Sequence, residues 1–193
     1  MEIKKKGYIF AADLKLQRMT RKVNVSQDTL HQYLTEHGVK LVRLAELTGL
    51  SEASINVCFN HKMGSNGKPR VFTPQAIEKI NEALPKLADS ISGCLLTFAP
   101  KNKKPNRKGN VYDPALVCPI KNEIGRHFNL GFFCEKVFGW SKSMKHNILE
   151  SNTGLAYGHI SKEDVERANT ELTAVASVLA SYRVIIDIDI SDM

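Results

Sequence analysis

The second half of the sequence repeats the residue pattern of the first half, and this repeat limits the folds that the chain can adopt. Residues 28–62 align with 118–152, and residues 73–98 align with 161–186. Apolar residues coincide along both alignments, and the identical pairs are His37/His127, Gly49/Gly139, Ser51/Ser141, Glu78/Glu166, Asn81/Asn169, Leu84/Leu172 and Ala88/Ala176. Self-similarity of this kind indicates a duplicated structural unit. We therefore expect two copies of one fold, here called the first and the second repeat.

Each repeat is predicted to contain four helices followed by a strand. Apolar spacing, caps and glycines predict helices over 28–37, 41–48, 51–61 and 74–92 in the first repeat, and over 114–128, 132–138, 141–150 and 161–180 in the second. Apolar runs predict strands over 94–98 and 183–190. The expected fold class is mainly α. The two strands could pair in a small sheet, pack separately, or pair with residues 7–10.

The domain organisation follows from the repeat and from the distribution of charge. We expect a basic arm over 1–27, a first domain over 28–98, a basic linker over 99–113 and a second domain over 114–193. The formal net charge is +7, and the arm alone carries seven Lys and Arg residues against two acidic residues. Positive charge gathered on an arm and a linker suits a polyanionic partner.

Other sequence features favour a soluble cytoplasmic protein. No apolar run approaches the roughly 20 residues that a membrane span needs, and the N-terminus shows no signal-peptide pattern. The four cysteines form no CxxC pair, and no histidine lies at zinc-finger spacing from a cysteine pair. Buried free thiols in a reducing compartment are therefore expected.

The segment Leu44–Lys62 has the residue pattern of two helices joined by a sharp turn. The small Ala45 allows a close helix crossing, Gly49 makes the turn, and Leu50 and Ile55 pack the following helix down. This segment resembles the helix–turn–helix of the lambda-repressor and Cro-type DNA-binding family. The resemblance covers residues 28–91 well and 114–180 loosely, and it implies two such units in tandem.

The resemblance also implies a set of DNA-contacting residues in the first repeat. Base edges would face Glu52, Ala53 and Val57, and phosphates would face Ser51, Asn60 and Lys62. Lys68 and Arg70, in the following Gly- and Pro-rich loop, could add phosphate contacts or be part of a solvated loop.

The second repeat has more basic candidates but a poorer scaffold. The corresponding positions, which begin at the predicted helix cap, hold Ser141, Lys142, Ser143, Lys145, His146 and Asn147. Glu135 replaces the small Ala45, and Lys145 stands where Ile55 packs; Met144 could take over that packing after a shift of one residue.

These features predict a sequence-specific protein for double-stranded DNA, without enzymatic activity, that acts as a transcriptional regulator. Its two recognition helices would enter the major groove, with the chain forming an intramolecular pseudo-dimer or a homodimer. The alternative is a protein–protein interaction module that keeps the scaffold without specific DNA readout, which Glu52 in the leading helix favours.

A third possibility, an enzyme of mobile DNA, lacks support because the sequence shows no catalytic cluster. No nucleophile elbow and no HExxH motif occur. Gly64–Lys68 fails the spacing of a phosphate-binding loop, and the pair Asp187/Asp189 has no partner cluster. We therefore expect no catalytic residues, no metal site and no cofactor.

Overall fold

Residues 27–98, 114–150 and 160–185 are described by a computed structural model, and its regular structure is helical. The first repeat contains α2 (Gln27–Glu36), α3 (Leu41–Thr48), α4 (Glu52–Phe59) and α5 (Pro74–Ser92). These bounds lie close to the predicted ones. The mainly α prediction is confirmed.

The second repeat follows the same order with less regular helices. Its first three helices each include a π-helical turn, labelled η. The first consists of α6 (Pro114–Pro119), η1 (Ile120–Ile124) and α7 (Gly125–His127), the second of α8 (Leu130–Phe133) and η2 (Cys134–Phe138), and the third of α9 (Lys142–Lys145) and η3 (His146–Glu150). The fourth helix is α10 (Lys162–Ser181). The described helices of the first repeat contain no such turn. A π turn widens the helix locally and changes which residues face the core.

The turns and caps form where the sequence predicts them. Gly49 and Gly139 both adopt φ of 69°, the left-handed conformation that a residue with a side chain rarely takes. The side chain of Ser51 accepts a hydrogen bond from the Ser54 N–H, and Ser141 accepts one from the Met144 N–H. Both repeats therefore contain the same device, a left-handed glycine followed two residues later by a serine cap.

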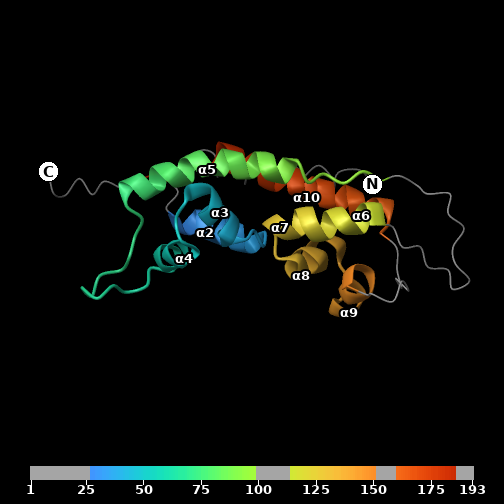
Figure 1. Cartoon of the computed structure of the whole chain (residues 1–193), viewed down its shortest axis with the longest axis horizontal. Coiled ribbons are helices and arrows are strands. Elements are labelled where there is room, and N and C mark those ends of the chain that lie inside the picture. Colours follow the sequence, from blue (N-terminus) through green and yellow to red (C-terminus); the bar gives the residue numbers. More distant parts are fainter. Residues whose placement is uncertain (1–26, 99–113, 151–159, 186–193) are drawn as a thin grey trace, which may run out of the picture.

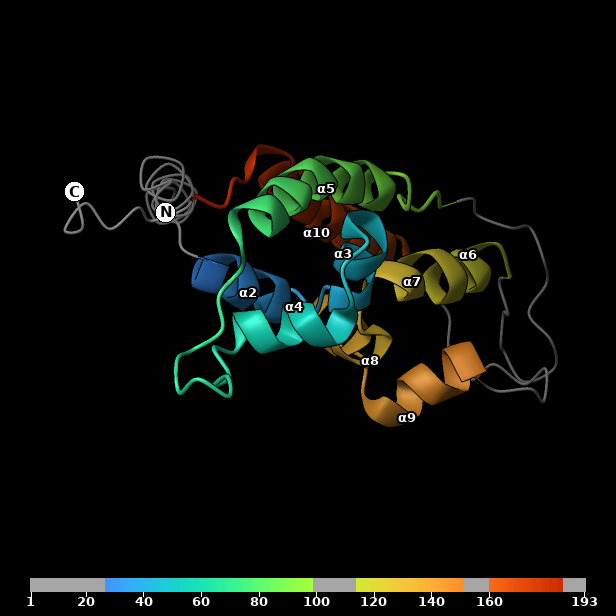
Figure 2. The same cartoon turned by 60° about the vertical axis from the view of Figure 1, so that its left-hand side comes forward.

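The long helices α5 and α10 lie side by side along one edge of the molecule (Figure 1). The repeat-matched pairs Leu84/Leu172 and Ala88/Ala176 are buried on these helices, and one continuous apolar core joins the two repeats. The shorter helices of each repeat lie beneath this pair, as Figure 2 shows from a second direction. The two repeats are thus packed against each other through their last helices.

The prediction of strands and of a sheet between them is wrong for the described residues. Residues 95–98 and 182–185 form no strand and do not pair with each other. The apolar residues of these segments pack against helices instead of forming a sheet, since the Leu96 and Val184 side chains are buried. Residues 7–10 and 186–190, also considered for the sheet, lie outside the described residues.

Asparagine side chains, rather than a partner strand, form hydrogen bonds with the backbone of the two extended segments. The Asn169 amide accepts from the Leu96 N–H at 2.8 Å and donates to the Leu96 carbonyl at 2.8 Å. The Asn81 amide accepts from the Val184 N–H at 2.8 Å and donates to the Val184 carbonyl at 2.9 Å. Each asparagine thus binds the extended segment of the other repeat. This arrangement arises because α5 and α10 run antiparallel, so the middle of each helix lies beside the end of the other. We call these four bonds the crossed asparagine bonds.

The matched histidines also reach across to the other repeat. His37 Nδ1 lies 2.6 Å from Glu171 Oε1 on α10, and His127 Nε2 lies 3.1 Å from Ser90 Oγ on α5. Most of the identical pairs therefore lie at the turns or at the junction between the repeats, because these sites need the same side chain twice.

The cysteines follow the prediction only in part. None of the four forms a disulfide bond; Cys94 and Cys134 are buried, and Cys58 is half-buried. The expectation of a buried thiol is wrong for Cys118, which is exposed on α6.

Candidate nucleic-acid interface

The first repeat builds its helix pair as the sequence predicts. Leu44 and Ile55 are fully buried, and Ala45 on α3 is 6% exposed. Leu50 packs against the same core while Gly49 turns the chain. These contacts hold α4 on the surface by one face and leave its opposite face to solvent.

Most of the predicted reading residues of α4 are accessible. Glu52 and Ala53 in its first turn are exposed, and Val57 is half-buried one turn later. Ser51 caps the helix, so its side-chain oxygen is engaged with the Ser54 N–H. At the other end, exposed Asn60 donates from Nδ2 to the Asn56 carbonyl at 2.8 Å.

The predicted loop after α4 is an ordered hairpin. The Arg70 N–H donates to the Lys62 carbonyl at 3.1 Å, and the Gly64 N–H donates to the Lys68 carbonyl at 2.8 Å. Lys62, Lys68 and Arg70 are all exposed. We call residues Lys62–Arg70 the basic hairpin.

The corresponding helix of the second repeat presents a basic surface. Lys142, Ser143 and His146 are exposed, while Lys145 and Asn147 are half-buried. A shallow cavity of about 450 Å³ is lined by Lys142, Ser143, Lys145 and His146. The Ser141 cap fixes the first turn of this helix, and the buried Ile148 and Leu149 hold its second half to the core.

The scaffold of the second repeat departs from the first at the predicted positions. Glu135 is exposed where Ala45 is buried, and Lys145 is half-buried where Ile55 has no exposure. The suggestion that Met144 takes over this packing is wrong, since Met144 is 37% exposed. Phe138 on η2 and Ile148 on η3 are buried in the core, and at the aligned positions of the first repeat Thr48 is buried and Cys58 is half-buried.

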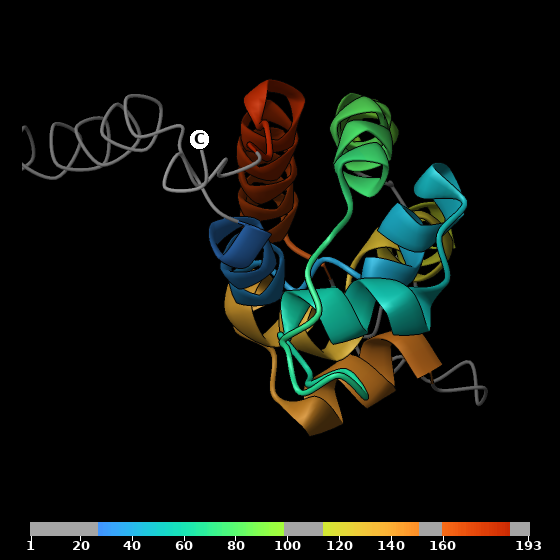
Figure 3. The same ribbon diagram turned by 90° about the vertical axis from the view of Figure 1, so that its left-hand side faces the viewer.

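The two candidate helices lie on the same side of the molecule. In all three views α4 and α9 lie opposite the α5–α10 pair, and the view along the long helices separates the two layers (Figure 3). The basic hairpin projects on this side as well (Figure 2). The structure therefore brings the candidate residues of both repeats to one face.

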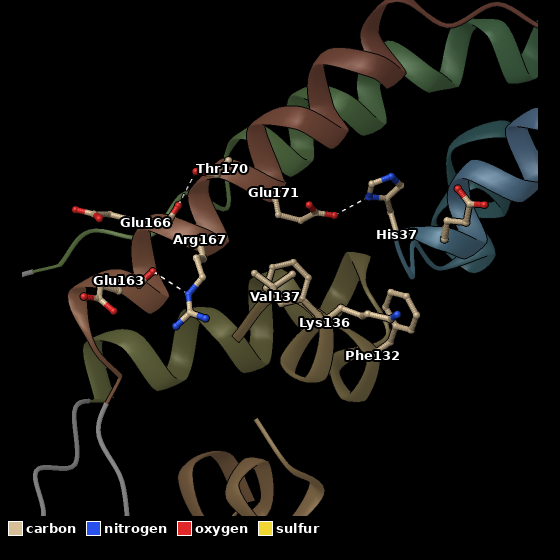
Figure 4. A pocket seen from close by; sticks show the side chains of 11 residues that line it. His37, Phe132, Lys136, Val137, Glu163, Glu166, Arg167, Thr170 and Glu171 are labelled. Atoms are coloured by element: carbon tan, nitrogen blue, oxygen red, sulfur yellow. Dashed lines mark hydrogen bonds and ion pairs between the residues drawn. The ribbon is translucent and has the colours of Figure 1, made fainter. Parts of the chain in front are cut away.

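Sequence analysis missed a groove between the repeats. It has a volume of about 820 Å³ and lies between the end of α2, the α8–η2 helix and the first half of α10 (Figure 4). The His37–Glu171 ion pair crosses it, and Phe132, Lys136 and Arg167 line its walls. Two of the identical pairs, His37/His127 and Glu78/Glu166, each contribute one residue to the lining of this groove.

Two arginines form ion pairs within their own helices, one on α3 and one on α10. Arg43 is ion-paired with Glu46, and Arg167 Nη2 lies 2.8 Å from Asp164 Oδ1. His127 is buried, and burial, reinforced by the positive charges of Arg43, Arg126 and Lys40, lowers its pKa from 6.5 to about 4. Within the described ranges, no three His, Cys, Asp or Glu side chains are placed to hold a metal ion.

Comparisons with known proteins add no family to these observations. No helix among the described residues is long and apolar enough to cross a membrane. A scan against protein-family models and searches of curated proteins and of solved structures give no match to this chain.

Proposed function

We propose that the protein binds double-stranded DNA through α4 and α9 as an intramolecular pseudo-dimer, and that it acts as a sequence-specific transcriptional regulator. One observation supports this above all. Both repeats place a serine-capped helix after a left-handed glycine, and both helices lie on the face opposite the α5–α10 pair. Two helices presented on one face suit two successive major-groove contacts.

The candidate side chains of the two repeats suit different bases. Lys142 can donate to guanine O6 and N7, and Asn147 can pair with adenine. Glu52 can accept from the cytosine amino group, while Ala53 can contact a thymine methyl group. Because the two sets differ, the preferred DNA site should contain two unlike halves.

The proposal can be tested with the purified full-length chain and a randomised fluorescent duplex pool. Anisotropy measured at several salt concentrations should give a steep dependence of affinity on salt. Sequencing of the retained duplexes should then reveal an enriched bipartite site. Lys142→Ala should relax the preference in one half of the site only, by about 1–3 kcal/mol at the contacted base.

A matched control removes the same charge elsewhere. Lys86 is exposed on α5, in the layer opposite α4 and α9. Lys86→Ala should leave the sequence preference unchanged. Enrichment that survives Lys142→Ala unaltered would contradict a reading role for α9.

One observation favours a second function, that of a protein-interaction module. Helix α4 contains no Lys or Arg, and its first turn presents the exposed carboxylate of Glu52. A carboxylate at this position repels phosphate. Absence of duplex binding even at low salt would favour this second function.

A further inference from the structure

The basic hairpin has a fixed shape although nearly all of its residues are exposed. Besides the bonds between its two sides, the Gly67 N–H donates to the Gly64 carbonyl at 3.0 Å, and Gly67 adopts φ of 72° at the tip. The Lys68 N–H donates to Asn66 Oδ1 at 3.1 Å. The hairpin backbone is therefore held in one arrangement, which sets where its basic side chains begin.

The base of the hairpin is hydrogen-bonded to the first residue of α2. Gln27 Nε2 donates to the Cys58 carbonyl at 3.1 Å, and Gln27 Oε1 accepts from the Phe72 N–H at 3.5 Å. One side chain thus bridges the residues before and after the hairpin. The Phe59 and Phe72 rings meet edge to face at 5.0 Å beneath it.

A strained residue directs the chain out of α4. His61 adopts φ of 47°, which is uncommon for a residue with a side chain. Its ring nitrogen Nε2 lies 2.6 Å from Asp28 Oδ1 at the start of α2. Strain of this kind persists where surrounding contacts fix the backbone.

The charge of the hairpin is of one sign. No acidic residue occurs between His61 and Ile77, whereas Lys62, Lys68 and Arg70 all lie in the hairpin. Helix α4 lacks basic residues, so the hairpin supplies the positive charge that its helix does not have. In the second repeat the basic residues lie on the recognition helix itself.

Geometry places the hairpin where a DNA backbone would pass. Helix α4 has eight residues and is therefore about 12 Å long, which is close to the width of the major groove, about 12 Å. With the first turn of α4 at the base edges, its C-terminal end lies at the border of the groove. The hairpin begins there, on the same face.

We infer that the basic hairpin is a phosphate clamp for duplex DNA beside the half-site of the first repeat, and that Gln27, Asp28 and His61 are its positioning residues. This inference rests on the proposed function. It assigns different sources of backbone binding to the two repeats: the first adds sequence-tolerant phosphate contacts from the hairpin to the base contacts of α4, whereas the second carries its basic residues on α9 itself.

The test measures duplex affinity against salt for the full chain, using a mixed-sequence fluorescent duplex. Each phosphate contact steepens the logarithmic salt slope by about 0.9, so the double variant Lys68→Ala with Arg70→Ala should lower the slope by about 1.8. Between about 50 and 200 mM salt, the wild-type affinity should then fall roughly 12-fold more than that of the variant. The matched control, Lys79→Ala with Lys86→Ala on α5, removes the same charge and should change the slope little.

Gln27→Ala tests the positioning role. It should weaken duplex binding about fivefold, the cost of one neutral hydrogen bond, while the salt slope stays that of the wild type. In the background of the double hairpin variant, the same substitution should have no effect on affinity. A merely structural role would give the same loss in both backgrounds.

The outcomes separate the two proposals. Wild-type binding with an unchanged slope in the hairpin variant would overturn the clamp but leave the DNA-binding proposal standing, and so would equal losses in the hairpin and α5 variants. A wild-type chain that binds no duplex at low salt would overturn the proposed function and the clamp with it.

Discussion

The two repeats share one topology but differ in how well their short helices are packed. In the first repeat Ile55 anchors α4 with no exposed surface, whereas the second repeat has Lys145 at that position and a π-helical turn in each of its first three helices. Most of the residues that stay identical lie instead at the turns and at the junction. Within this chain, the junction between the repeats therefore keeps more identical residues than α4 and its counterpart in the second repeat, which share none.

The strongest test of this comparison removes matched core side chains. Leu84 and Leu172 are both fully buried, so Leu84→Ala and Leu172→Ala should each lower the free energy of unfolding by about 2–5 kcal/mol. The two losses should be similar, because α5 and α10 bury them in one shared core. Urea unfolding followed by circular dichroism measures both, and a large loss in one variant alone would mean that the repeats are stabilised separately.

Stability should depend on pH through the buried His127. The pKa of His127 is about 4 in the folded chain and about 6.5 when unfolded, so the unfolded state binds more protons between these values. Stability should therefore fall as the pH drops from about 6.5 towards 4, by up to about 3 kcal/mol from this residue. His127→Gln should remove this part of the loss in unfolding experiments at about pH 7 and pH 5.

His37→Gln is the control for that measurement. His37 faces the carboxylate of Glu171 rather than a group of positive charges, so its removal should leave the acid-induced loss in place. A loss that persists in His127→Gln and disappears in His37→Gln would reverse the assignment.

The crossed asparagine bonds should contribute equally on both sides. Asn81→Ala and Asn169→Ala each remove two hydrogen bonds and leave a backbone N–H and carbonyl without a partner. Each substitution should cost about 1–3 kcal/mol of unfolding free energy. Thermal or urea unfolding checks this, and a cost near zero at either site would show that water replaces the amide there.

The smallest expected effect concerns the helix caps. Ser51→Ala and Ser141→Ala each remove one cap bond and should cost about 0.5–2 kcal/mol. We expect the smaller loss for Ser141→Ala, because the helix that it caps is less tightly packed. Hydrogen exchange of the first-turn amides distinguishes local fraying from global unfolding, and a larger loss at Ser141 would contradict the packing difference.

The sequence predicted the parts of the fold that depend on local signals. The Gly49 and Gly139 turns and the Ser51 and Ser141 caps have short-range chemical causes, and the helices lie near their predicted bounds. The strands were mispredicted because apolar alternation is the same whether a segment packs in a sheet or against helices. Asn169, the partner of Leu96, lies 73 residues away, so no local pattern reveals it.

The candidate site was predicted in its residues but not in its geometry. Exposure of Glu52, Lys68 and Lys142 follows from the helix and loop patterns. The hairpin fold and its tie to Gln27 depend on contacts between distant segments. The π-helical turns of the second repeat were not predicted, since the sequence pattern indicated only helices over these residues.

The crossed asparagine bonds join two repeats of one chain, so the association of the repeats does not depend on protein concentration. A regulator assembled from two separate chains loses half of its contacts on dilution, since mass action dissolves the dimer. Here the covalent connection holds the two halves at a high effective concentration. Under the proposed function, occupancy of a DNA site should therefore follow a simple hyperbola in protein concentration.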